Sequence, residues 1–268
     1  MRYLYDHDLH IHSNISPCAS DPIQTPETIL NYALENKLNT ICITDHFWDE
    51  AVTVLPENWY KSLNLERISS ALPLPQADGV RFLFGCETDI DRTLALGVAR
   101  ENFDKFDFIV VPTTHMHMSG FTMTLEEGAT TESRAKAWVK RLDALLSMDL
   151  PFHKVGIAHL VCALIASASR EMLLETLSLI PDSEMERLFK KAASLGVGIE
   201  LNRDDAGYKE DEKDIILRPF RIAKDYGCKF YLGSDAHTHD AFSNARERFD
   251  KFIDDLALTE ADKFVVPQ

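Results

Sequence analysis

The sequence predicts an α/β fold in which parallel strands alternate with helices. Short apolar runs rich in β-branched and aromatic residues recur along the 268 residues, and longer segments of helical periodicity separate them. Most of these apolar runs end in histidine, aspartate or glutamate. No low-complexity tract or Gly/Ser-rich linker interrupts the chain, so we expect a single domain over residues 1–268.

Seven apolar runs are expected to be strands: 5–9, 40–43, 80–86, 106–111, 154–158, 197–201 and 229–232. Seven strands of this kind suggest a barrel with seven repeats, whose carboxyl-terminal strand ends meet on one rim. The same alternation also fits an open, doubly wound sheet.

The first helix has the clearest start signal. Thr25 is suited to cap it, Pro26 occupies the first helical position, and apolar residues follow at helical spacing to about Asn36. Helical periodicity predicts further helices at about 59–72, 131–146, 183–195, 212–226 and 241–256.

Composition limits the partners of the chain. The formal net charge of −15 disfavours binding of long nucleic acids, whereas a small phosphorylated substrate requires metals or basic residues to reverse the local charge. The longest apolar stretch, 155–168, is interrupted by His159 and is too short to cross a membrane. The amino terminus lacks the pattern of a signal peptide, so we expect a cytoplasmic protein.

The chain has five cysteines and no C-x-x-C pair. This odd number indicates free thiols in a reducing compartment, and it argues against a disulfide framework or a thiolate zinc site.

Side chains with metal-binding chemistry follow the predicted strands. In an extended 8–12 segment, Asp8, His10 and His12 share one face, and two imidazoles so placed can bind one ion; the alternative is a pair of polar residues on an exposed strand. A single histidine at a strand end is usually structural, but here histidine or carboxylate follows five further strands. Imidazole with carboxylate suits zinc, manganese or iron.

The order of these motifs resembles the PHP (polymerase and histidinol phosphatase) superfamily. The motifs are D-L-H-I-H-S at 8–13, I-T-D-H at 43–46, G-C-E at 85–87, the strand leading to His115, the isolated His159, and G-S-D-A-H at 233–237. The resemblance implies a distorted (β/α)7 TIM-like barrel that holds two to three divalent metal ions.

The resemblance also implies a set of ligands. His10 and His12 would hold one metal with Glu87 and Asp235, and Glu87 would reach a second metal bound by His115 and His159. A third would be held by His46, His237 and a residue of the loop after His12. That loop has no further histidine before His46, so Asp21 is the candidate.

The implied activity is hydrolysis of a small phosphomonoester by a metal-activated hydroxide, with Glu87, Asp235 and His237 as catalytic residues and histidinol phosphate as the first substrate candidate. The alternatives are a nuclease or nucleotide phosphoesterase of the same fold and a non-catalytic, metal-stabilised binding module. A serine hydrolase is disfavoured because Ser234, Asp235 and His237 are too close in sequence to form a triad and no G-x-S-x-G motif exists.

Two residues are candidates for substrate binding. Arg203 follows the sixth predicted strand and could clamp a phosphate, or could pair with Asp204 or Asp205. His117 could be a rim group that contacts substrate. The segment 116–131 lacks periodicity and is either a lid or a long connection.

Overall fold

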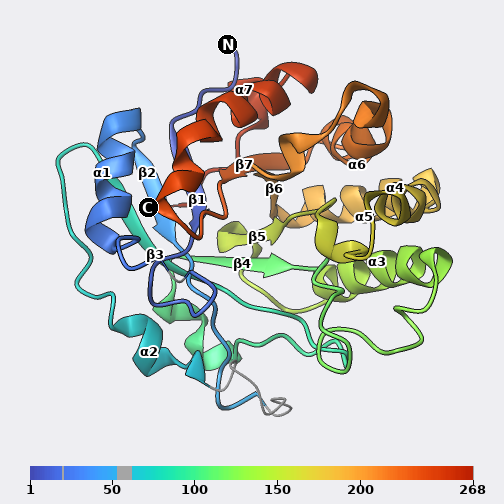
Figure 1. The fold of residues 1–268 in the computed structure, drawn as a ribbon, viewed down its shortest axis with the longest axis horizontal. Coiled ribbons are helices and arrows are strands. Elements are labelled where there is room, and N and C mark those ends of the chain that lie inside the picture. The colour runs from blue at the N-terminus through green and yellow to red at the C-terminus, as the bar shows by residue number, and fades with distance from the viewer. Residues whose placement is uncertain (20, 53–61, 268) are drawn as a thin grey trace.

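The computed structural model describes residues 1–19, 21–52 and 62–267. Its centre is a seven-stranded parallel sheet in which each strand pairs with the next along the chain. The strands are β1 (His7–Ile11), β2 (Thr40–Ile43), β3 (Arg81–Glu87), β4 (Phe108–Pro112), β5 (Val155–Ala158), β6 (Gly198–Asn202) and β7 (Lys229–Gly233). The helices lie outside these strands (Figure 1). The predicted TIM-like α/β barrel is therefore confirmed.

The barrel closes where β7 returns to β1. The Asp235 N–H, just beyond β7, donates to the His10 carbonyl at 2.7 Å. At the other end of the seam, His7 Nε2 accepts from the Leu232 N–H at 3.0 Å, so a side chain takes the place of a backbone partner. This closure brings the histidines of β1 beside the polar residues that follow β7.

Seven α-helices are seen in the described residues: α1 (Pro26–Asn36), α2 (Leu65–Ser69), α3 (Thr131–Leu146), α4 (Arg170–Ser178), α5 (Asp182–Leu195), α6 (Lys213–Asp225) and α7 (Ala245–Asp255). Thr25 caps α1 as predicted, because its side chain accepts from the Thr28 N–H. No described helix combines the length and apolarity needed to cross a membrane.

Three helical expectations differ from the structure. Within the described residues, the helix predicted at 59–72 is only Leu65–Ser69. It begins there because the Asn64 side chain caps it by accepting from the Arg67 N–H. Residues 59–61 lie outside the described residues. The predicted helix at 241–256 begins as a 3-10 turn and becomes α7 at Ala245. Helix α4 was not predicted.

Aromatic side chains fill the barrel interior. Phe108 and Tyr231 meet edge to face at 5.2 Å between ring centroids, and both are fully buried. Gly156 provides the space for them, since a Cβ there would lie 2.6 Å from atoms of both rings. Side-chain packing therefore blocks any passage along the barrel axis.

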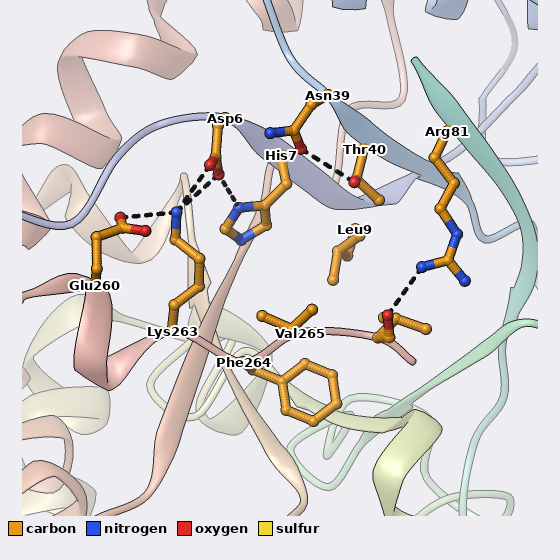
Figure 2. A pocket seen from close by; sticks show the side chains of 11 residues that line it. Asp6, His7, Leu9, Asn39, Thr40, Arg81, Glu260, Lys263, Phe264 and Val265 are labelled. Carbon is orange, nitrogen blue, oxygen red and sulfur yellow. Dashed lines mark hydrogen bonds and ion pairs between the residues drawn. The ribbon is translucent and has the colours of Figure 1, made fainter. Parts of the chain in front are cut away.

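The carboxyl-terminal segment covers the amino-terminal end of the barrel. The Phe264 N–H donates to the Phe230 carbonyl at 2.7 Å, and Lys263 Nζ pairs with Asp6 at 2.9 Å and Glu260 at 2.8 Å. Figure 2 shows Asp6, Glu260, Lys263 and Phe264 around a cavity of about 270 Å³ that residues of β1, β2 and β3 also line. The opposite, carboxyl-terminal mouth holds the histidines and carboxylates described next.

Candidate metal centre

The carboxyl ends of the strands bring most of the predicted ligands together. His10 lies in β1 and Glu87 ends β3, whereas the remaining ligands directly or closely follow β1, β2, β4, β5 and β7. The side chains of His10 and His12 are 0% exposed and that of Glu87 is 2% exposed. Ionisable groups at this depth require a compensating partner.

A first group forms around β1. His10 Nε2 and His12 Nε2 are 3.2 Å apart, and Asp235 Oδ1 lies 3.1 Å from His12 Nε2. Glu87 Oε2 is 3.4 Å from the same nitrogen. Two imidazole nitrogens and two carboxylates thus point at one place, which is the donor set that zinc, manganese or iron accepts.

A second group shares Glu87. Its Oε1 lies 3.4 Å from His159 Nε2 and 3.9 Å from His115 Nε2. This oxygen is buried and makes no hydrogen bond within the part of the chain that the structure describes. A buried carboxylate oxygen without a hydrogen bond, facing imidazole nitrogens, fits a bound cation.

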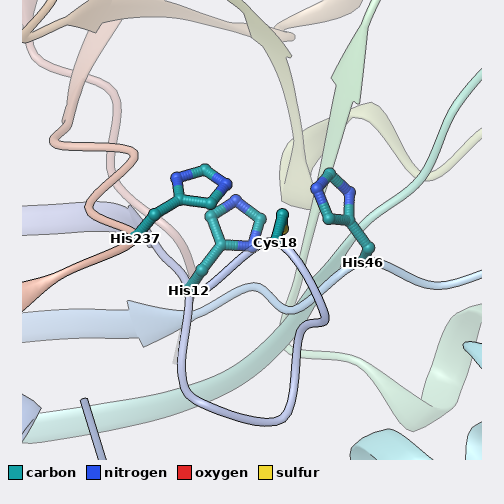
Figure 3. Close-up of side chains that lie close together, drawn as sticks. All are labelled: His12, Cys18, His46 and His237. Atoms are coloured by element: carbon teal, nitrogen blue, oxygen red, sulfur yellow. The ribbon is translucent and has the colours of Figure 1, made fainter. Parts of the chain in front are cut away.

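A third group lies at the edge of the mouth and includes a cysteine. Figure 3 shows Cys18, from the loop after β1, beside the histidine that starts the same loop and histidines of two other segments, and one ligand atom from each residue lies within 4.8 Å of the others. The members are His12, Cys18, His46 and His237. The cysteine pattern of the sequence argued against a thiolate site, but here the thiol joins imidazoles rather than other thiols.

Asp21, the predicted loop ligand, is not part of this group. Its Oδ1 accepts from the Ile23 N–H and its Oδ2 from the His239 N–H, both at 3.1 Å. The carboxylate is thus engaged in holding two loop backbones together. Cys18, from the same loop, is the residue that lies beside His46 and His237.

Carboxylate and carbonyl oxygens set the tautomers of three histidines. His10 Nδ1 is 2.7 Å from Glu200 Oε1, His115 Nδ1 is 2.8 Å from Asp89 Oδ1, and His237 Nδ1 is 2.8 Å from the Asp235 carbonyl. Because these oxygens accept a proton donor, each Nδ1 carries the hydrogen and each Nε2 lone pair is available to a metal. Sequence reasoning missed Glu200, although a glutamate within an apolar strand was a signal.

The electrostatics of the centre call for positive charge. Burial opposes ionisation of Glu87, but the charges of His46 and His10 outweigh it and hold the Glu87 pKa well below its usual range. Burial likewise opposes protonation of His10, yet Glu200, Asp235 and Glu87 raise its pKa to about 10. The carboxylates therefore remain ionised, with imidazolium or a metal ion as their compensation.

Cys18 is also affected by its neighbours. Desolvation alone would raise the pKa of its thiol, but hydrogen bonds with His237 and His46 outweigh that effect and lower the pKa to about 5.

Two of the site residues have left-handed backbones. His159 has φ of 39° and Asp235 has φ of 51°, a region that non-glycine residues seldom occupy. Strain of this kind costs about 1 kcal/mol or more per residue and concentrates at functional sites. Asp235 belongs to the first group of potential ligands and His159 to the second.

The groups surround a cavity of about 190 Å³ whose lining residues are Cys18, His46, Glu87, His115, His117, Leu164, Asp235 and His237. His117 lies where the sequence placed a substrate-contacting group. Burial and the charge of His115 lower its pKa to about 4, so its imidazole is neutral at pH 7.

Arg203 does not line this cavity. Its guanidinium pairs with Asp204 at 2.9 Å and donates to the Ala241 carbonyl at 2.5 Å. The alternative of an ion pair with Asp204 therefore describes the structure better than a phosphate clamp.

The 116–131 segment packs as a connection. Arg141 is 1% exposed and donates to the carbonyls of Thr113 at 2.7 Å, Thr122 at 2.5 Å and Ile90 at 2.8 Å. The Thr122 hydroxyl in turn donates to the His115 carbonyl. These bonds hold the backbone around His115.

Comparisons with known proteins agree with the barrel fold. The chain superposes on histidinol phosphate phosphatase HisK from Lactococcus lactis, solved with zinc, L-histidinol and phosphate, with a TM-score of 0.59 at 15% identity over 93% of this chain and 94% of that one. A protein from Listeria monocytogenes described as a HisK histidinol phosphatase gives 0.57 at 14% identity, over 88% and 96%. At such identities the likeness shows the fold alone.

No curated protein matches the sequence. A family profile does match, and it spans the segment from β1 through the end of β6. The profile is that of the PHP domain, over residues 8–204. The chain belongs to the PHP domain family.

Proposed function

We propose that this protein is a metal-dependent phosphoesterase that hydrolyses a small phosphomonoester. One observation carries the proposal: Glu87 lies between the two groups of imidazoles, in a buried mouth that opens to a small cavity. Its Oε2 is 3.4 Å from His12 Nε2, and its Oε1 is 3.4 Å from His159 Nε2 and 3.7 Å from His10 Nε2. A carboxylate shared between two sets of nitrogen donors suits a pair of divalent ions of the kind that serve phosphoryl transfer.

The residues have separate tasks in this proposal. One ion would be held by His10, His12, Glu87 and Asp235, a second by Glu87, His115 and His159, and a third by His46, His237 and a loop residue. Bound zinc, manganese or iron would polarise the phosphoryl oxygens and supply a hydroxide near neutral pH.

The catalytic residues proposed are Glu87, Asp235 and His237, because all three line the cavity where a phosphoryl group would sit. His117 lines it too, and its neutral imidazole can form a hydrogen bond with substrate. Glu200 and Asp89 act indirectly, by orienting His10 and His115.

The substrate proposed is a small alcohol phosphate, with histidinol phosphate as the first candidate. Pockets for drug-sized ligands measure roughly 300–1,000 Å³, so a cavity of about 190 Å³ suits a phosphoryl group with a small organic part. The net charge of −15 counts against a long nucleic acid. The HisK structure from Lactococcus lactis, with its zinc, histidinol and phosphate, supports the same choice.

Phosphate release from a panel of phosphomonoesters, including histidinol phosphate and mononucleotides, tests this function. The wild type with added zinc or manganese would be compared with His159→Ala, and with the same protein after chelation. His153→Ala is the matched control, because His153 is exposed and lies before β5. We expect turnover that chelation and His159→Ala abolish and His153→Ala retains. No release from any compound by fully metallated wild type would refute the proposal.

A further inference from the structure

The loop after β1 places a thiol where the sequence suggested a carboxylate. Among the five cysteines, Cys42, Cys86 and Cys228 are buried and Cys162 is half-buried, whereas Cys18 is exposed and lines the cavity at the centre. Figure 3 shows it between the histidines of this group, His237 and His46. A structural cysteine packs in the apolar core, and this one does not.

The ring nitrogens are already divided between the groups. His12 directs Nε2 at His10, Glu87 and Asp235, and its Nδ1 lies 3.4 Å from the Ser16 hydroxyl. His12 therefore serves the first group. The nitrogens that can serve a site beside Cys18 are those of His46 and His237.

Each of those two histidines has one nitrogen engaged elsewhere. His46 Nδ1 faces Glu87 Oε2 at 2.9 Å, and His237 Nδ1 donates to the Asp235 carbonyl at 2.8 Å. Their Nε2 atoms are the donors that can join the Cys18 sulfur. Cys18, His46 and His237 all line the cavity, so a fourth coordination position would face the space that a substrate enters.

One carboxylate holds the parts of this group in place. Asp45 accepts from the Ser13 N–H at 2.8 Å, the Ser13 hydroxyl at 2.6 Å and the Ser16 hydroxyl at 2.7 Å. Asp45 directly precedes His46, so the same side chain fixes the loop of Cys18 and the strand end of His46. A ligand set supported in this way is pre-organised for binding.

We propose that Cys18, with His46 and His237, forms a thiolate-containing metal site that prefers zinc to manganese or magnesium. This inference rests on the proposed function for the presence of ions in the mouth, and adds the identity and chemical preference of one of them. The first and second groups offer only nitrogen and oxygen, which suit manganese and iron as well as zinc, whereas a soft thiolate selects zinc-like ions.

Cobalt(II) substitution tests the thiolate directly. Metal-free protein titrated with cobalt(II) should develop a near-ultraviolet sulfur-to-cobalt charge-transfer band. We expect the band in wild type and in Cys162→Ser, the matched control in which the other incompletely buried thiol is removed. We expect no such band in Cys18→Ser or in Cys18→Asp.

Metal content gives a second readout. After dialysis against zinc, Cys18→Ser should retain one zinc ion fewer per chain than wild type, or bind that ion at least about tenfold more weakly, the minimum loss typical even of outer-shell substitutions. Cys18→Asp should restore an ion with a shifted preference for manganese. Circular dichroism would confirm that each variant is folded.

The outcomes separate this inference from the proposed function, because neither readout requires turnover. A charge-transfer band that persists in Cys18→Ser, or its absence in cobalt-loaded wild type, would overturn the Cys18 site even if the protein hydrolyses phosphomonoesters. A band lost only with Cys18 would establish the site even if no phosphomonoester is a substrate.

Discussion

Replacing Glu200 with glutamine should weaken metal binding without touching a proposed ligand. Glu200 is fully buried; its Oε1 lies 2.7 Å from His10 Nδ1, and its Oε2 accepts from the His159 N–H at 2.8 Å and from Asn202 Nδ2 at 3.2 Å. A glutamine that keeps its oxygen toward the two donors presents its amide NH2 group to His10 Nδ1. The ring proton of His10 must then move to Nε2, which removes the lone pair needed for a metal.

The size of the effect follows from the role of such outer partners. Loss of a residue that hydrogen-bonds to a metal ligand, without binding the metal itself, typically costs roughly 10–100-fold in metal affinity or activity, which corresponds to about 1.4–2.7 kcal/mol. We expect Glu200→Gln to lower both zinc affinity and phosphate release within that range. Glutamine has nearly the same shape as glutamate, so we expect the variant to fold, with lower stability in the metal-free protein because one partner of a buried pair is lost.

Zinc competition against a chromophoric chelator measures the affinity, and thermal unfolding of the metal-free protein shows whether the fold is intact. Glu184→Gln is the control, since Glu184 is a partly exposed carboxylate paired with Arg187 on α5. A zinc affinity for Glu200→Gln within twofold of wild type, with activity unchanged, would refute the assignment of Glu200 as the residue that orients His10.

Three further predictions concern stability. Burial opposes ionisation of Asp255, but hydrogen bonds from Lys213, at 2.6 Å, and other donors lower its pKa to about 2. Asp255→Asn should therefore reduce the free energy of unfolding by about 1 kcal/mol above pH 4, and by progressively less as pH falls toward 2. A loss of stability that does not depend on pH in urea titrations would contradict this. Gly156→Ala should cost about 1–3 kcal/mol by overpacking Phe108 and Tyr231, and an unchanged urea midpoint would contradict it. A metal ion at a free concentration 100 times its Kd adds about 2.7 kcal/mol per site to the free energy of unfolding. Chelation should therefore lower Tm by about 5 °C or more. Differential scanning fluorimetry can measure this shift and its reversal when zinc is added.

Much of the fold could be predicted because parallel strands buried on both faces are nearly continuous apolar runs. The predicted runs correspond to β1 through β7 with end shifts of a few residues, and α3 matches its predicted limits. Helix α4 was missed although Ser169 caps it, since its nine residues carry only three buried positions. The sequence pattern at 59–72 did not show that the helix would begin only after Asn64, whose side chain caps it.

The sequence alone determined which strand ends carry histidine and carboxylate, because in a parallel barrel those ends meet whatever the packing of the helices. Only the tertiary structure decided which residues of other segments form hydrogen bonds with these histidines. Glu200 lies in β6 and contacts His10 in β1, whereas Asp89 follows β3 and contacts His115 after β4, so these contacts join different strands and have no trace in local spacing. Local spacing likewise did not show that Cys18, rather than Asp21, lies beside His46 and His237, since contacts between segments, such as those of Asp45 with Ser13 and Ser16, determine which loop side chain faces the mouth.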